Sequence, residues 1–351
     1  GNEMKKLLVS LLTLVMLTES LSACTAAKVY SYGVGTVIEV SASDYVPATD
    51  TVAAKDGKYG VNVDIVSVVL DSKGKVVSCT WDIAQASNLK FNNVGVHTTD
   101  LAAYVLKTKL EKGADYGMKG ASAIGKEWFE QSAVLTNYIV GMTAEEVAAI
   151  AINDAGEATS ADILAGTTIG IDSFKAAFAK AVANAVETKK VAKYGVATMF
   201  AVSGSDFVPA AGEVAAKDGK YGVNVDVVKV TLDKDGKILN VVWDIAQTSN
   251  LKFNDAGIHT TDLAAYVLKT KAEKGDAYGM KGASAIGKEW FEQAAFLETY
   301  VIGKTLAEVK AIELNDAGEA TNADIKAGAS IGIETFIATL EKAIEAAVEV
   351  K

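Results

Sequence analysis

The stretch Tyr59-Gly60-Val61-Asn62-Val63-Asp64 decides the fold, because it recurs unchanged as Tyr221-Gly222-Val223-Asn224-Val225-Asp226. The match continues at this spacing, without a gap, from Tyr32 and Tyr194 to Glu187 and Glu349. A repeat of this length indicates tandem domains rather than a solenoid. We therefore expect two homologous domains, at 32–190 and 191–351. The short joint at 188–192 should hold them close together.

Each copy combines a hairpin pattern with later helical patterns. Val61, Val63 and Ile65 alternate with polar residues before a turn at 71–74 and a second β-rich run, and the order recurs around 233–236. Helical spacing and capping signals predict first-copy helices at 101–112, 125–138, 147–152 and 173–187. Strands and helices are segregated, so we expect an α+β fold in which each domain packs a mainly antiparallel sheet with helices. Each copy should have its own core and fold as a unit.

The first residues have the order of a bacterial lipoprotein signal. Lys5 and Lys6 precede an apolar run at 7–17, and Leu21-Ser22-Ala23-Cys24 follows. A plain secretory peptide would leave the cysteine after the small residues unexplained. We expect a signal peptide at 1–23, a lipid on Cys24 and a tether at 24–31. The chain would then be lipid-anchored at the extracellular face of the cell membrane.

Composition excludes several functional classes. The chain has 351 residues, a formal charge of −10 and no arginine, so nucleic acid is not an expected partner and any phosphate must be held without a guanidinium group. Two cysteines and two histidines are too few for a disulfide framework or a metal centre. Once Cys24 is lipidated, Cys79 has no partner, and a buried apolar role is expected for it.

One segment of each copy carries the chemistry. It reads Asp162-Ile163-Leu164-Ala165-Gly166-Thr167-Thr168 in the first copy and Asp324-Ile325-Lys326-Ala327-Gly328-Ala329-Ser330 in the second. This order of Asp, two further residues, a small residue, Gly, a small residue and then Thr or Ser resembles the recognition sequence of flavin transferases, which join FMN through its phosphate to the final hydroxyl. The pattern occurs in the C subunit of sodium-translocating quinone reductase and in FMN-binding domains of bacterial surface lipoproteins.

The resemblance implies two covalently attached FMN groups, with Asp162, Gly166, Asp324 and Gly328 in the recognition sequence. Comparison of the copies selects the attachment residues: Thr167 corresponds to Ala329, whereas Thr168 and Ser330 both have a hydroxyl. The phosphate would lie ahead of a helix opening near residue 172, whose free backbone N–H groups favour an anion. The alternative is an ordinary small-residue turn entering a helix.

Further matched residues are candidates for contacts with the flavin ring. A methionine, a lysine and a tryptophan in each copy could stack on the ring or balance its reduced charge, and a glutamine could pair with its polar atoms. They are Met118, Lys119, Trp128 and Gln85 in the first copy, and Met280, Lys281, Trp290 and Gln247 in the second. Ordinary core packing is an equal alternative. For His97 and His259 a loop or capping contact is expected.

The resemblance implies an electron carrier that passes electrons from a membrane quinol or dehydrogenase system to extracellular acceptors such as ferric iron, after maturation by a flavin transferase. The sequence has no nucleophile elbow, P-loop or dinucleotide fingerprint that would indicate an autonomous enzyme. One alternative is a flavin-bearing electron-transfer subunit of a separate extracellular reductase. Another is a solute-binding or adhesive lipoprotein without a cofactor.

Overall fold

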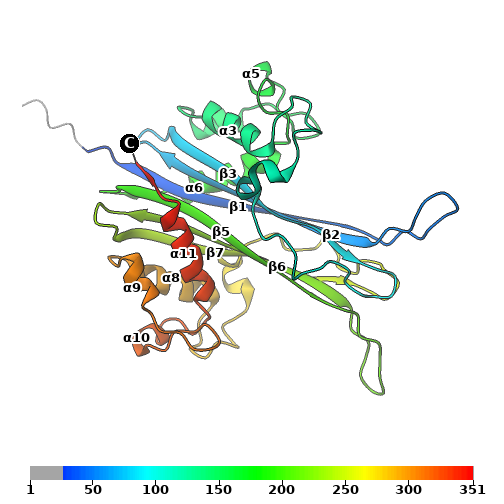
Figure 1. The fold of residues 1–351 in the computed structure, drawn as a ribbon. Coiled ribbons are helices and arrows are strands. Elements are labelled where there is room, and N and C mark those ends of the chain that lie inside the picture. The colour runs from blue at the N-terminus through cyan, green and yellow to red at the C-terminus, as the bar shows by residue number, and fades with distance from the viewer. Residues whose placement is uncertain (1–26, 351) are drawn as a thin grey trace, which may run out of the picture.

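The computed structural model describes residues 27–350, and the predicted lipidation residue Cys24 lies outside this range. Two antiparallel four-stranded sheets form its centre (Figure 1). The first has the order β3-β2-β1-β4, with β1 at Tyr30–Ser43, β2 at Gly57–Leu70, β3 at Val76–Phe91 and β4 at Val186–Thr188. The second has the order β7-β6-β5-β8, with β5 at Lys193–Ser205, β6 at Gly219–Leu232, β7 at Ile238–Phe253 and β8 at Val348–Glu349. The predicted hairpins and the α+β class are confirmed.

Helices follow the strands in both copies. In the first copy they are α2 (Lys109–Lys112), η1 (Gly113–Tyr116), α3 (Trp128–Tyr138), α4 (Ala144–Ala148), α5 (Ala161–Leu164) and α6 (Asp172–Ala183). In the second they are α7 (Lys271–Lys274), η2 (Gly275–Tyr278), α8 (Trp290–Val301), α9 (Leu306–Lys310), α10 (Ala323–Lys326) and α11 (Glu334–Glu345). A capping box opens α4: Thr143 Oγ1 accepts from Glu146 N, and the Glu146 carboxylate accepts from Thr143 N.

All four predicted helices of the first copy differ from the structure in extent. Only 109–112 of the range 101–112 is helical, because the Asp100 carboxylate accepts from the backbone N–H groups of residues 102 and 103 and holds a turn. The last helix ends at Ala183 rather than at 187, because residues 186–188 form β4 and pair with β1. The helices expected from 125 and over 147–152 are also displaced, to 128–138 and 144–148.

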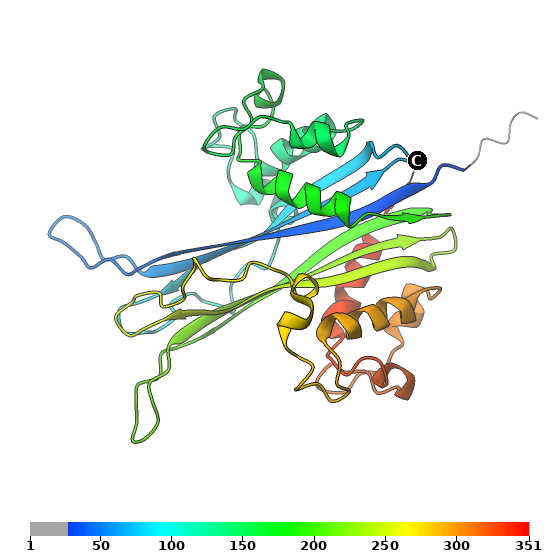
Figure 2. The same ribbon diagram turned by 180° about the vertical axis from the view of Figure 1, so that it is seen from behind.

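The molecule has four layers, helices on sheet on sheet on helices, and the two views agree on this order (Figures 1 and 2). Because side chains alternate along a strand, β2 presents Val66 and Val68 to the helices of its own copy and Val61 and Val63 to the other sheet. A bulge opposite Tyr59–Val61 then keeps Phe91 on the face between the sheets.

The expectation that each copy has its own core is therefore only half correct. Each sheet forms one core with its own helices, and a third core lies between the two sheets. In the third core the ring of Phe91 stacks on that of Phe253, with centroids 4.6 Å apart. Beside it, the rings of Tyr32 and Tyr194 are in contact, with centroids 5.2 Å apart. Each pair joins a residue to its own repeat equivalent, as on the axis of a twofold dimer.

Reciprocal contacts surround this axis. Tyr45 N donates to Gly257 O, and Phe207 N donates to Gly95 O, both at 2.7 Å. Lys180 pairs with Glu273 at 2.8 Å, and its equivalent Lys342 pairs with Glu111 at 3.0 Å. The two histidines take part in this interface: His97 pairs with Asp206, and His259 pairs with Asp44. The copies are thus joined as a fused pseudo-dimer, in agreement with the expected closeness.

Candidate functional site

A cavity of about 610 Å³ lies between the outer face of the second sheet and its helices. Ser330, the predicted attachment residue of the second copy, lines it. The other lining residues are Ala201, Asn224, Asp226, Trp243, Ile245, Lys271, Met280, Ala283, Ser284, Ala285, Trp290, Gln293, Glu319, Ile331, Gly332 and Thr335.

Strands β6 and β7 form one wall of the cavity. Asp226 and Trp243 come from paired strands, and the Trp243 indole Nε1 donates to Asp226 Oδ1 at 2.9 Å. Trp290, at the first position of α8, packs edge to face on Trp243 with ring centroids 5.0 Å apart. This side of the cavity is aromatic, and Trp243 and Trp290 are each 2% exposed.

A buried glutamine on the adjacent helix holds the attachment segment. Gln293 Oε1 accepts from the Ser330 backbone N–H at 2.8 Å and lies 3.5 Å from Ser330 Oγ. Its Nε2 donates to Ser284 Oγ and to Lys288 O, so hydrogen bonds at both the oxygen and the nitrogen fix the orientation of the carboxamide. Gln131 makes the same contacts in the first copy, with Thr168 N at 2.8 Å. Sequence reasoning missed both glutamines, since only the fold brings residues 37 positions apart into contact.

The hydroxyls of Thr167 and Thr168 have different surroundings. Thr167 is fully buried, and its Oγ1 donates to Gln131 O at 2.8 Å inside the protein. Thr168 is half-buried and its Oγ1 donates to Gln131 Oε1 at 3.3 Å. At the equivalent of Thr167, Ala329 is buried without a hydroxyl, while Ser330 is half-buried. The residue at the second position of each pair is therefore the more exposed one, and in both copies it has a hydroxyl.

The glycine of the motif has a packing role. A Cβ on Gly166 would lie 2.4 Å from Val134 Cγ1, and one on Gly328 would lie 2.2 Å from the Phe296 ring. The glycines thus let the segment lie directly on α3 or α8. The aspartates of the motif, Asp162 and Asp324, are exposed in the first turns of α5 and α10. Asp324 is not part of the cavity wall.

The lysine at the cavity differs from the one selected by sequence. Lys119 and Lys281 are exposed, and Lys281 does not line the cavity. Lys271 does, with Nζ 5.1 Å from the Tyr278 ring and 5.4 Å from the Trp290 ring. Its equivalent Lys109 is 8% exposed and lies over Tyr116 and Trp128. The N-cap threonines Thr108 and Thr270 mark the starts of α2 and α7 in the sequence. That the lysine after Thr270 lies at the cavity follows only from the fold.

The remaining predicted residues divide between the cavity and its surroundings. Met280 and Trp290 line the cavity, and their equivalents Met118 and Trp128 pack in the first helix-facing core. Gln247 is paired with the cavity residue Asn224 on the neighbouring strand, and its Oε1 accepts from Tyr278 Oη at 3.2 Å. Gln85 holds the same register position in the first sheet. Both glutamines lie beside the site, and Gln247 is not in its wall.

An unpaired buried oxygen marks the first copy's site. Asp64 is fully buried; its Oδ1 accepts from Trp81 Nε1 at 2.7 Å and from Ser173 Oγ at 3.0 Å, while Oδ2 has no partner. Burial raises the pKa of Asp64 to about 6. Burial raises the pKa of its equivalent Asp226 as well. Asp64 therefore keeps a buried acceptor without a partner beside Trp81 and Ser173.

These features fit an FMN group. The volume is within the usual range of about 300–1,000 Å³ for ligand pockets, and aromatic surfaces combine with a few fixed polar groups. The attachment hydroxyl lies at the wall, so a phosphoester there would direct the rest of the molecule into the cavity. The first turn of each following helix carries Asp172 or Glu334, which offsets the positive helix end. The lysine of α2 or α7 is therefore the main cation of the site.

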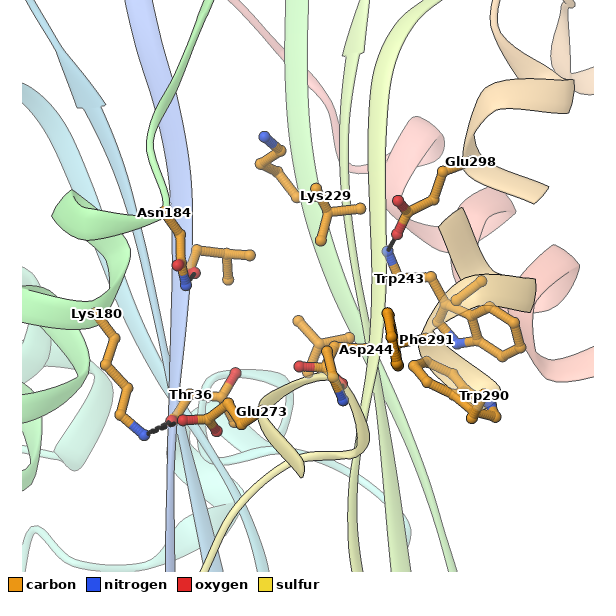
Figure 3. A pocket seen from close by; sticks show the side chains of 15 residues that line it. Thr36, Lys180, Asn184, Lys229, Trp243, Asp244, Glu273, Trp290, Phe291 and Glu298 are labelled. Carbon is orange, nitrogen blue, oxygen red and sulfur yellow. Dashed lines mark hydrogen bonds and ion pairs between the residues drawn. The ribbon is translucent and has the colours of Figure 1, made fainter. Parts of the chain in front are cut away.

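A second cavity, of about 530 Å³, lies between the copies (Figure 3). Trp243 and Trp290 line it as well, so the two cavities lie next to each other at these residues. Lys229 and Glu298 also line it, and burial lowers the pKa of Lys229 to about 8 and raises that of Glu298 to about 7. Lys229 Nζ donates to Tyr32 O, and Glu298 Oε1 accepts from Trp243 N, so both polar groups are engaged within the protein.

Comparison with known proteins gives one similarity. No family model and no solved structure matches the chain. A chlorophenol reductase of Desulfitobacterium hafniense is 36% identical over 97 residues, which cover 25% of this chain and 30% of that protein. The chain thus spans less than a third of that relative. Within residues 27–350 no helix is long and apolar enough to cross a membrane, and no group of three or more His, Cys, Asp or Glu residues could hold a metal ion.

Proposed function

We propose that the protein is an extracellular, membrane-anchored electron carrier with two FMN groups joined by phosphoester bonds to Thr168 and Ser330. The observation that carries the proposal is the half-buried hydroxyl of Ser330 at a 610 Å³ aromatic cavity, within a segment that resembles a flavin-transferase recognition sequence. Thr168 has the same contacts to its glutamine. Bound FMN supplies the redox chemistry, which the protein side chains do not provide themselves.

The residues around the cavity have separate roles in this proposal. Gln131 and Gln293 orient the attachment segments through their fixed carboxamides. Trp128 and Trp290 exclude water, because they are almost fully buried. Lys109 and Lys271 place a positive charge beside the cofactor and favour extra electron density there. The exposed Asp162 and Asp324 are available for recognition by the flavin transferase.

Covalent attachment and anchoring suit work outside the cell. A dissociating cofactor would be lost by diffusion, whereas a phosphoester retains it. A lipid on Cys24 would hold the carrier near a membrane quinol or dehydrogenase system, and the electrons would leave to extracellular acceptors such as ferric iron. These partners, the lipid anchor and the location at the extracellular face of the cell membrane belong to the proposal.

A second candidate function is a flavin-bearing subunit of a separate extracellular reductase. The observation in its favour is the partial similarity to a chlorophenol reductase, which is restricted to 30% of that protein. The two functions differ in whether electron transfer to the acceptor requires a partner protein. A carrier, once chemically reduced, passes electrons directly to ferric iron in solution, whereas a subunit requires its reductase partner.

The intact mass of the protein tests whether it is a covalent flavoprotein. Coexpression with a flavin transferase should add two FMN groups, and expression without the transferase should add none. A colourless protein of unchanged mass in both cases would contradict the proposal and favour a solute-binding or adhesive lipoprotein.

Anchoring is tested separately through Cys24. Cys24→Ala should release the protein from membranes or leave it unprocessed. The matched control is Cys79→Ala, because Cys79 is only a partly buried neighbour of the first core. Normal processing and membrane retention of Cys24→Ala would contradict the lipoprotein assignment.

A further inference from the structure

The two copies differ in charge at their candidate flavin sites, and we infer that Glu39 gives the first flavin a more negative reduction potential than the second. Electrons then run from the first copy to the second. This inference rests on the proposed function and deepens it, because it assigns the copies unequal roles and a direction of transfer.

The difference becomes visible when the cavity wall is compared between the copies. Of the 17 residues that line the second cavity, 14 have an identical equivalent in the first copy. The three that differ are Ala201, Ser330 and Thr335, whose equivalents are Glu39, Thr168 and Ser173. The last two exchanges keep a hydroxyl. Only the exchange at Glu39 changes the charge.

Strand register gives Glu39 and Ala201 the same position. Glu39 pairs with Asn62 between β1 and β2, and Ala201 pairs with Asn224 between β5 and β6. Ala201 and Asn224 both line the cavity of the second copy. The pseudo-symmetry of the sheets therefore puts the Glu39 side chain at the matching part of the first site.

The electrostatics of neighbouring groups agrees with this position. Glu39 is an exposed residue, and its partial desolvation, followed by repulsion from Asp172, raises its pKa, while Lys109 lowers it. Glu39 in turn contributes to the raised pKa of Asp64, after the larger effect of burial. Glu39 thus interacts with Asp64 and with the cavity lysine of its own copy. The second site has the equivalent aspartate and lysine but no such glutamate.

A carboxylate at this position opposes reduction. A flavin that gains electrons becomes more negative or must take up protons, and a nearby negative charge disfavours the negative form. Glu39 also offsets part of the positive charge of Lys109. At equilibrium, electrons that enter the first flavin from a membrane donor therefore move on: the first flavin is reoxidised, and the second is reduced by the same number of electrons.

Redox titration followed by absorbance tests the inference in the flavinylated protein. Ser330→Ala isolates the first flavin and Thr168→Val isolates the second. The first flavin should have the more negative midpoint potential. Glu39→Ala and Glu39→Gln should both shift it upward toward the second, and Ala201→Glu should shift the second downward.

The three charge variants separate charge from packing, since Glu39→Gln keeps the shape of the side chain. Equal potentials in the two single-flavin proteins, or an unchanged potential in Glu39→Gln, would overturn the inference. Flavin content is measured on the same samples by absorbance. A chain that takes up no FMN contradicts the proposed function itself, so the two failures are distinguishable.

Discussion

Gln131 and Gln293 show how single residues prepare the candidate attachment site. Each is fully buried, and each uses its carboxamide to join the attachment segment to the loop before its helix. The hydroxyl of the neighbouring Thr167 is buried and donates a hydrogen bond to Gln131 O, whereas Thr168 is only half-buried.

Flavin stoichiometry should follow this difference. We expect Thr168→Val and Ser330→Ala each to lose one of two FMN groups, because each removes the accessible hydroxyl. Thr167→Ala should keep both and lose about 1 kcal/mol of stability with its buried hydrogen bond. Peptide mapping and intact mass measure the outcome. A flavin peptide attached at Thr167 would contradict the assignment.

Stability should depend on pH through the buried carboxyls. Burial raises the pKa of Asp64, Asp82 and Asp244 to about 6, above an unfolded value of about 4. Folding therefore favours their protonated form, so their contribution is full below about pH 4 and is lost as the pH rises through about 6. The melting temperature of the cofactor-free protein should fall between pH 4 and pH 7.

Asp64→Asn should reduce this fall. Two pKa units correspond to at most about 3 kcal/mol, and the amide oxygen can still accept from Trp81 and Ser173. The control Asp162→Asn, at an exposed position, should keep the full pH dependence. Thermal unfolding across this pH range provides the measurement, and an unaltered slope in Asp64→Asn would refute the role given to its burial.

At the scale of elements, α6 and α11 lie directly on their sheets because of glycines in the first strand of each copy. A Cβ on Gly33 would lie 2.0 Å from Ala181 O, and one on Gly195 would lie 2.0 Å from Ala343 O. Since these neighbours are helix backbone atoms, a side chain there would have to displace the helix. The glycine is thus a packing residue rather than part of a nucleotide-binding loop.

Gly33→Ala should therefore destabilise the protein by about 1–3 kcal/mol through overpacking, and Gly195→Ala should do the same in the second copy. Gly120→Ala is the matched control, because nothing lies within 4 Å of its added Cβ. Urea unfolding measures the difference. Equal stability of Gly33→Ala and Gly120→Ala would show that the helix yields without cost.

At the scale of the whole molecule, the duplication has become an internal dimer. The core between the sheets contains Phe91 and Phe253, which are both fully buried only because the copies cover each other. The reciprocal pairs Lys180–Glu273 and Lys342–Glu111 also tie α6 and α11 to the short helices that carry the site lysines. Each candidate site is thus supported by the opposite copy.

A fragment of residues 191–350 should consequently form a homodimer, with Phe253 stacked on its own equivalent across a twofold axis. Phe253→Asp should abolish the dimer or unfold the fragment, because it puts a charge into an apolar core. Light scattering and thermal unfolding distinguish these states. A stable monomeric fragment with the melting temperature of the full chain would contradict the shared core.

The sequence by itself determined the duplication, the hairpins, the α+β class and the segment that ends at Thr168 or Ser330. These properties follow from local patterns, namely alternation along strands, turn residues and capping boxes, and from the identity between the copies. Only the tertiary structure decided that Gln293 and Lys271, rather than Lys281, line the cavity of the second copy, and that residues 186–188 form a strand. It also revealed the core between the sheets. These features depend on contacts between residues far apart in the chain, whose partners no local pattern specifies.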